Sequence, residues 1–277
     1  MTTPDAARPR VTLSTSSVYP LKVEAAFETA ARLGYDGVEV MVLADPVTQD
    51  VARLREFERT YGVPILSLHA PTLLVTQRAY GTTDPWVKLD RTVDLAKEIG
   101  CESIVLHPPF RWQRQYAAGF VEGVARMERE RDIVLAVENM FPWRAGGREV
   151  KAYLPTWDPV PQAYRHVTLD LSHAATARSD VLAMQAALGD RLAHVHLADG
   201  SGSFTDEHLV PGRGTQPCGE FLTRLGASGF TGVVAVEVST RRGGGANRDA
   251  DLAGSLEFAR THLEAGRPGD DGAGPLA

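Results

Sequence analysis

Cysteines and long apolar runs are scarce in this sequence. Two cysteines, Cys101 and Cys218, in 277 residues are too few for a disulfide scaffold and indicate a reducing compartment. No stretch approaches the roughly 18 consecutive apolar residues that a membrane-spanning helix needs. The N-terminal MTTPDAARPR has no apolar core of the kind that secretory signals carry. We therefore expect a cytoplasmic protein without a membrane partner.

An excess of positive charge is also missing. The chain has 29 Lys and Arg against 35 Asp and Glu, which gives a formal net charge of −6. Nucleic-acid affinity rests on a basic surface, so this balance disfavours a nucleic-acid partner while leaving a local basic patch open. The hydrophobic fraction of 43% and the charged fraction of 23% are ordinary for a globular chain with a buried core.

Short apolar runs alternate with helical patterns along the chain. Runs rich in Val, Ile and Leu predict eight strands, at residues 11–15, 38–42, 65–69, 103–107, 134–138, 167–170, 192–197 and 233–237. Helices are predicted at 21–33, 50–61, 84–99, 116–131, from 158, and at 180–188, 218–225 and 247–264. Apolar strands that alternate with helices indicate a parallel sheet. We expect an α/β fold, a single-domain (β/α)8 TIM barrel, with a doubly wound open sheet as the rival.

No linker divides the chain into two domains. The barrel is predicted over residues 11–264. Residues 1–10 and 265–277 are rich in glycine, proline and charge, and this composition predicts disordered tails at the two ends.

Polar side chains stand at the carboxyl ends of six successive predicted strands, the third to the eighth. They are His69, His107, Glu138, Asp170, His196 and Glu237, and they are 38, 31, 32, 26 and 41 residues apart. In a closed barrel such positions converge on the C-terminal mouth, where barrel enzymes place their chemistry. Any one of them could be an ordinary hydrogen-bonded residue at a strand end. Six in succession, all of metal-ligand type, predict a metal site.

Two short motifs extend this set to nine candidate ligands. Asp170 and His173 form D-x-x-H, and Asp206 and His208 form D-x-H in a long polar loop, 198–216. The alternative interpretation is a helix-capping Asp and a solvated loop His. Imidazole with carboxylate suits Zn, Mn, Fe or Co. Because four carboxylates in one mouth repel each other unless cations neutralise them, we expect more than one divalent ion.

Residues that could support these ligands also follow the strands. Metal-binding histidines need partners on their second ring nitrogen, and Ser67, Glu39 or Ser14 could supply them. Trp112 and Trp143 follow the fourth and fifth predicted strands. They are either ordinary packing residues or an apolar wall that excludes water and binds a substrate.

The strand ends carry a family resemblance. The segments SLHAP, VLHPP, VEN, LDLSH, HVHLAD, DEH and VEV resemble the xylose-isomerase-like TIM-barrel superfamily, over roughly residues 11–264. That group contains sugar isomerases and epimerases and also endonuclease IV.

The resemblance to the isomerase and epimerase branch implies one metal ion and two catalytic glutamates. Its ligands would be Glu138, Asp170, His196 and Glu237. Glu138 and Glu237 would work as an acid/base pair on an enediolate carbon. His173 and Arg213 would contact the substrate. The function that this branch implies is a divalent-metal-dependent isomerase or epimerase of a small sugar, a sugar phosphate or a hydroxy-keto acid.

The resemblance to endonuclease IV implies three zinc ions instead. All nine candidate residue types match that ligand set, and the implied alternative is a multinuclear metallohydrolase of a phosphoester. The segments LDLSHAATA and VPGRGTQP depart from the nuclease pattern, and a net charge of −6 fits poorly with gripping duplex DNA. A non-enzymatic binding barrel is the third reading. The sequence leaves the oligomeric state open, a homo-oligomer included.

Overall fold

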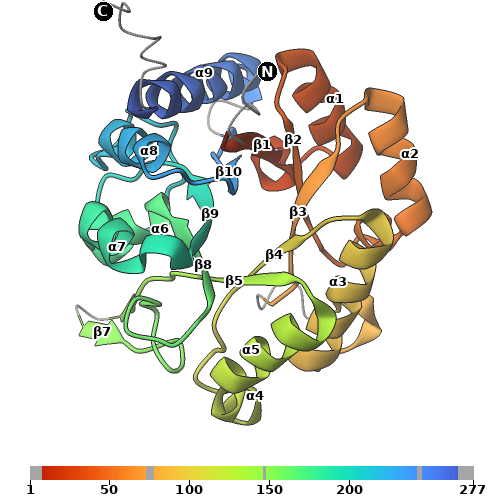
Figure 1. Ribbon diagram of the computed structural model, residues 1–277, viewed down its shortest axis with the longest axis vertical. Coiled ribbons are helices and arrows are strands. Elements are labelled where there is room, and N and C mark those ends of the chain that lie inside the picture. Colours follow the sequence, from red (N-terminus) through yellow and green to blue (C-terminus); the bar gives the residue numbers. More distant parts are fainter. Residues whose placement is uncertain (1–7, 73–77, 146–147, 242–244, 268–277) are drawn as a thin grey trace, which may run out of the picture.

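A computed structural model describes residues 8–72, 78–145, 148–241 and 245–267 of the protein. Eight parallel strands close into a barrel, and helices surround them (Figure 1). The strands follow each other around the barrel in the order β1 (Arg10–Ser14), β10 (Val233–Val236), β9 (Leu192–Leu197), β8 (His166–Asp170), β5 (Val134–Glu138), β4 (Ser103–Leu106), β3 (Ile65–His69) and β2 (Gly37–Met41). The prediction of a (β/α)8 TIM barrel is confirmed.

The helices pack outside the strands, with their apolar faces turned inward. They are α1 (Val23–Leu33), α2 (Val51–Tyr61), α3 (Pro85–Ile99), α4 (Arg114–Ala118), α5 (Phe120–Arg131), α6 (Leu171–Ala177), α7 (Val181–Leu188), α8 (Cys218–Ala227) and α9 (Arg248–Gly266). Single 3-10 turns are η1 (Thr15–Val18), η2 (Pro46–Gln49), η4 (Ala79–Gly81) and η5 (Gly189–Arg191). Within the described ranges, no helix is long and apolar enough to cross a membrane.

Several polar side chains are buried inside the barrel. Side chains alternate between the two faces of a strand, so Val195 of β9 packs in the apolar core while its neighbours His194 and His196 share the opposite face. Both histidines are fully buried, as are Glu39 of β2 and Ser67 of β3. These polar side chains fill the barrel beneath its mouth and support the residues above them.

Two predicted helices differ in the structure. The helix expected at 116–131 is interrupted by the non-helical Gly119, which separates α4 from α5. The helix expected from residue 158 is wrong. Asp158 accepts a hydrogen bond from the Val160 amide at 2.9 Å, and the chain makes a single turn there, because prolines at 159 and 161 remove helical donors.

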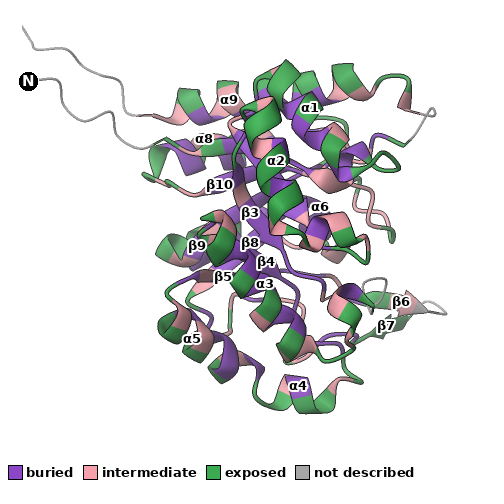
Figure 2. Ribbon diagram, turned by 90° about the vertical axis from the view of Figure 1, so that its right-hand side faces the viewer, coloured by how far each residue is buried: buried purple, intermediate pink, exposed green. Residues whose placement is uncertain are grey.

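The segment between β5 and β8 instead forms a short hairpin that the sequence did not suggest. Its strands are β6 (Trp143–Ala145) and β7 (Arg148–Val150), which pair antiparallel. The hairpin projects beyond the barrel at one end (Figure 2). The ordered barrel runs from Arg10 to Gly266, and most of the two predicted tails lies outside the described residues.

Close backbone contact between α8 and α9 gives a test of the packing. A Cβ added to Gly226 would lie 2.1 Å from the Leu263 carbonyl oxygen, whereas one added to Gly254 meets nothing within 4 Å. We expect Gly226→Ala to lower the free energy of unfolding by about 1–3 kcal/mol through overpacking. Gly254→Ala, on an exposed helical site, should raise it by about 0.5–1 kcal/mol. Urea unfolding of both variants checks this, and equal shifts of one sign would refute the packing.

Candidate metal centre

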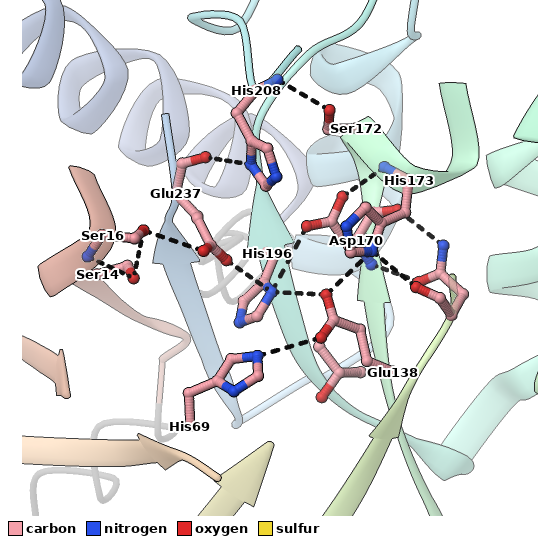
Figure 3. A network of polar contacts seen from close by, with 12 residues as sticks. Ser14, Ser16, His69, Glu138, Asp170, Ser172, His173, His196, His208 and Glu237 are labelled. Carbon is pink, nitrogen blue, oxygen red and sulfur yellow. Dashed lines mark hydrogen bonds and ion pairs between the residues drawn. The ribbon is translucent and has the colours of Figure 1, made fainter. Parts of the chain in front are cut away.

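The nine predicted ligands meet at the mouth formed by the carboxyl ends of the strands. Figure 3 shows His69, Glu138, Asp170, His173, His196, His208 and Glu237 among them. Seven of them line a cavity of about 300 Å³, namely His69, His107, Glu138, His173, Asp206, His208 and Glu237. Asp170 and His196 are fully buried beside it. The residues that the strand-end spacing predicted to be neighbours therefore lie in one region of the fold.

One ring nitrogen lies at the centre of this arrangement. His196 Nδ1 is 2.9 Å from Glu237 Oε2, 3.0 Å from Glu138 Oε1 and 3.5 Å from Asp170 Oδ2. Its other ring nitrogen, Nε2, is 3.0 Å from Glu39 Oε1. A ring nitrogen carries at most one proton, so Nδ1 cannot satisfy three carboxylates.

A cation between the ring and the carboxylates would resolve this conflict. Asp170 Oδ2 is buried and has no hydrogen-bond partner among the described residues, which is costly unless something else binds it. If the Nε2 proton points to Glu39, Nδ1 presents a lone pair on the side of the carboxylates. Oxygen and imidazole donors of this kind suit Zn or Mn. Glu138, Asp170, His196 and Glu237 therefore fit a divalent ion.

The end of β8 fixes the free oxygen of Asp170. Asp170 caps α6, and its Oδ1 accepts from the His173 amide at 2.6 Å. The Asn139 side chain accepts from the Asp170 amide at 2.6 Å and donates to its carbonyl at 2.9 Å. With the main chain and one oxygen held in this way, the second oxygen stays directed to His196.

Glu138 joins four histidines. Its Oε2 is 2.8 Å from His107 Nε2 and 3.3 Å from His69 Nε2, and its Oε1 faces both His196 and His173. Burial alone would raise the pKa of Glu138, but the charges of His196 and His107 lower it well below its usual range. A carboxylate in this position can bridge two ions, as four histidines around it would allow.

Protons take the place of cations when no ion is bound. Burial alone would lower the pKa of His196, but the neighbouring carboxylates, Glu237 foremost, raise it well above its usual range. Burial opposes ionisation of Glu237 as well, yet the His196 ring lowers the pKa of Glu237 to about 2. Metal binding to such a site must displace protons from the histidines.

The loop after β9 adds a third group of candidate ligands. Asp206 Oδ2 is 2.8 Å from His208 Nε2 and 3.2 Å from His173 Nε2. Burial lowers the pKa of His208, but the Asp206 carboxylate outweighs this and raises it to about 10. Ser172 donates to Asp206 Oδ1 at 2.6 Å and accepts from the His208 amide at 3.0 Å. These contacts place the loop over the mouth.

Asp199, which the sequence argument overlooked, anchors this loop. Its carboxylate accepts hydrogen bonds from the amides of Gly212, Gly214 and Gln216 at 2.9–3.0 Å. A Cβ added to Gly214 would lie 2.3 Å from Asp199 Oδ1, so only glycine permits this approach. Asp199 at the end of HVHLAD and the two glycines of VPGRG thus contact each other within one loop.

Supporting residues surround the ligands. Glu39 accepts from Ser67 at 2.7 Å and lies 2.9 Å from His194 Nε2, so it holds His196 from a fixed position. Ser16 donates to Glu237 Oε1 at 3.0 Å and contacts Ser14. Of the three residues predicted to contact histidine ring nitrogens, Glu39 does so. Ser67 contacts Glu39 and Ser14 contacts Ser16 instead. The sequence gave no sign of Ser16.

Residues close enough to share an ion form four triplets within the described part of the chain. They are Glu39–His194–His196, His69–Glu138–His196, Asp170–His173–His208 and Asp170–His196–Glu237. The last of these contains the unpartnered Asp170 oxygen and fits an ion best.

The predicted substrate residues fall in different places. Trp143 lines the cavity, and Trp112 lies against it with ring centroids 5.8 Å apart. Arg213 is not part of the described lining. Its guanidinium is exposed and lies 2.6 Å from Asp251 of α9, whose first-turn carboxylate draws it away from the mouth. The structure does not bring Arg213 to the site.

Comparisons with known proteins agree with this architecture. Residues 27–262 match a family model described as xylose isomerase-like TIM barrel. An uncharacterized protein of Mycobacterium tuberculosis is 51% identical over 274 residues, covering 92% of this chain and 98% of that protein. Fructoselysine 3-epimerase of Escherichia coli O157:H7 is 23% identical over 243 residues, covering 79% and 86%.

Solved structures share the fold. A D-tagatose 3-epimerase-like protein aligns with a TM-score of 0.65 at 20% identity, covering 93% of this chain and 98% of that one. A 3-keto-D-glucoside 4-epimerase from E. coli aligns with a TM-score of 0.68 at 15% identity, covering 92% and 100%. These likenesses establish the fold.

Glu39 offers a test of the metal centre that does not depend on activity. Glu39→Gln removes the charge that fixes the His196 ring, so we expect the affinity for Mn²⁺ or Zn²⁺ to fall about 10–100-fold. Competition with a chromogenic chelator measures the affinity, and Glu149→Gln, at an exposed position of β7, is the control. An unchanged affinity in a folded Glu39→Gln protein would contradict this role.

Proposed function

The chain belongs to the xylose isomerase-like TIM-barrel family, and we propose that it is a divalent-metal-dependent isomerase or epimerase of a small sugar. One observation carries the proposal: two glutamates, Glu138 and Glu237, approach the same nitrogen of His196 from different strands, beside a cavity of about 300 Å³. The epimerase names of the relative from E. coli and of the solved structures support the same reaction class.

The two glutamates can exchange a proton with a sugar carbon between them. Glu138 and Glu237 reach His196 from two sides (Figure 3), so a substrate above the ring would meet a carboxylate on each face. One glutamate would remove a proton from the carbon and the other would return a proton on the opposite face, which inverts or relocates the stereocentre. Ser16 holds Glu237, and His107 holds the outer oxygen of Glu138, so each base has a fixed orientation.

The other groups of the mouth would assist this exchange. A divalent ion held by Glu138, Asp170, His196 and Glu237 would supply Lewis-acid polarisation of the sugar oxygens. His173, next to Glu138 and at the cavity wall, would contact a substrate hydroxyl. Aromatic side chains on one side of the cavity would exclude water from the reacting carbon.

Solvent hydrogen exchange tests the two glutamates. With the metal-loaded protein and a ketose such as D-tagatose or D-fructose in D2O, we expect deuterium to enter the substrate carbon. Glu138→Gln and Glu237→Gln should lower the exchange rate by about 10²–10⁴-fold, while Glu149→Gln should not change it. NMR follows the exchange.

Both glutamates are also candidate metal ligands, so metal content must be measured beside the exchange. A variant that keeps its ion and loses exchange assigns the proton transfer to that glutamate. Exchange at the wild-type rate in either metal-loaded variant would remove that residue from the reaction.

A trinuclear phosphoesterase is the second candidate, and one observation favours it. His69 and His107 face one oxygen of Glu138, and His173, Asp206 and His208 form a separate group. Together with Asp170, His196 and Glu237, these two groups offer more donor atoms than a single ion uses.

Metal stoichiometry separates the two candidates. The isomerase requires one ion per chain for full deuterium exchange, whereas the phosphoesterase requires three and should hydrolyse bis(p-nitrophenyl) phosphate. We expect activity to saturate at one ion, as measured by native mass spectrometry during titration of the metal-free protein. Saturation at three ions together with phosphodiester hydrolysis would overturn the isomerase.

A further inference from the structure

The walls of the cavity carry no Arg or Lys side chain among the described residues. Besides the candidate ligands, its lining consists of Met41, Phe110, Met140, Phe141, Trp143 and Tyr153. The nearby Arg144 is engaged elsewhere, because it donates to the Thr176 carbonyl, contacts Glu149 and lies over the Phe204 ring. A phosphate group on the substrate would need an Arg or Lys partner, and the lining provides none.

The acidic members of the lining strengthen this point. Glu138, Asp206 and Glu237 all face the cavity, and carboxylates repel an anionic substituent at short range in a partly buried site. The ion expected at His196 would be occupied by the oxygens of the reacting carbons. We therefore expect the part of the substrate that does not react to be uncharged.

An aromatic shelf continues the cavity outward. Phe110 is stacked between Trp112, with centroids 4.7 Å apart and an interplanar angle of 6°, and Tyr153, at 5.1 Å and 29°. Main-chain hydrogen bonds from Arg111 to Ala152 and from Leu154 to Pro109 hold the two segments together. Trp143 of β6 lies 5.9 Å from the same Phe110 ring. The shelf, defined as Phe110, Trp112, Trp143 and Tyr153, thus has a built geometry.

The outer half of the shelf is open. Phe110 and Tyr153 are buried, whereas 51% of Trp112 and 37% of Trp143 is exposed. Two large exposed indoles beside the cavity are a surface that carbohydrate rings can stack on, since the C–H face of a sugar is apolar. The volume of the cavity, about 300 Å³, is at the lower end of the range for ligand-binding pockets. A second sugar ring would therefore have to lie outside the cavity.

We propose that the substrate is an uncharged sugar extended by a second ring, with the reacting sugar in the cavity and the second ring on Trp112 and Trp143. The inference rests on the proposed isomerase or epimerase function for the location of the reacting sugar. The occupant is a neutral glycoside-like ketose, because the described lining offers carboxylates but no Arg or Lys to a phosphate group.

Three probes that differ at one position test the charge and the size of the substituent. D-Fructose, isomaltulose and fructose 6-phosphate carry hydrogen, a glucosyl ring and a phosphate on the same oxygen. Isothermal titration of the Mn²⁺-loaded protein should give an affinity for isomaltulose about tenfold higher than for D-fructose, from one added stacking contact. Fructose 6-phosphate should bind no more tightly than D-fructose.

Variants of the shelf test whether the indoles cause the higher affinity for isomaltulose than for D-fructose. Trp112→Ala and Trp143→Ala should reduce the ratio of isomaltulose to fructose affinity to about twofold or less, and Trp112→Phe should keep most of it because an aromatic ring remains. Phe204→Ala serves as the control, since Phe204 is an exposed aromatic residue outside the cavity lining. It should leave the ratio unchanged.

Several results would overturn the inference. These are equal affinities for isomaltulose and D-fructose, tighter binding of fructose 6-phosphate, no binding of any probe, or an equal loss in Phe204→Ala. The deuterium exchange experiment judges the proposed function separately. If no ketose exchanges while isomaltulose keeps its advantage in binding, the shelf stands and the reaction assignment fails.

Discussion

Three carboxylates that converge on one nitrogen of His196 are the constraint on which the rest of this site depends. The ring can offer that nitrogen's single proton to only one of them, and Asp170 keeps a buried oxygen with no hydrogen-bond partner in the described part of the chain. Such an arrangement is stable only if protons or a cation neutralise it. The fully buried Glu39 below the ring and Ser16 beside Glu237 fix the donors, which prepares the mouth for an ion.

The closed parallel barrel explains why so much of this site could be predicted from the sequence. Successive strand ends point to one mouth, so residues about one strand–helix unit apart, such as His69, His107 and Glu138, become neighbours. The pattern of apolar runs predicted the eight strands to within a residue at each end, and polar residues at those ends predicted the candidate ligands. Because the barrel brings successive strand ends together, residues spaced by one strand–helix unit become neighbours. The candidate ligands could therefore be predicted without knowledge of side-chain contacts.

Contacts that depend on loops could not be predicted in the same way. Ser16 and Glu237 are 221 residues apart, and nothing in either neighbourhood indicates the bond. Arg213 stands in the loop that covers the mouth, yet a carboxylate of α9 holds its side chain outside. The hairpin that carries Trp143 lies between β5 and β8, in a segment where no strand was predicted. Loops therefore decide which substrate the mouth accepts, while the strands decide what chemistry it offers.

Anomalous diffraction from crystals grown with Mn²⁺ or Zn²⁺, recorded at the absorption edge of the metal, tests the central claim most directly. The account predicts a strong peak bonded to His196 Nδ1 and to carboxylate oxygens of Glu138, Asp170 and Glu237, at about 2.0–2.2 Å for zinc. The absence of a peak between His196 and these carboxylates in metal-saturated crystals would contradict it.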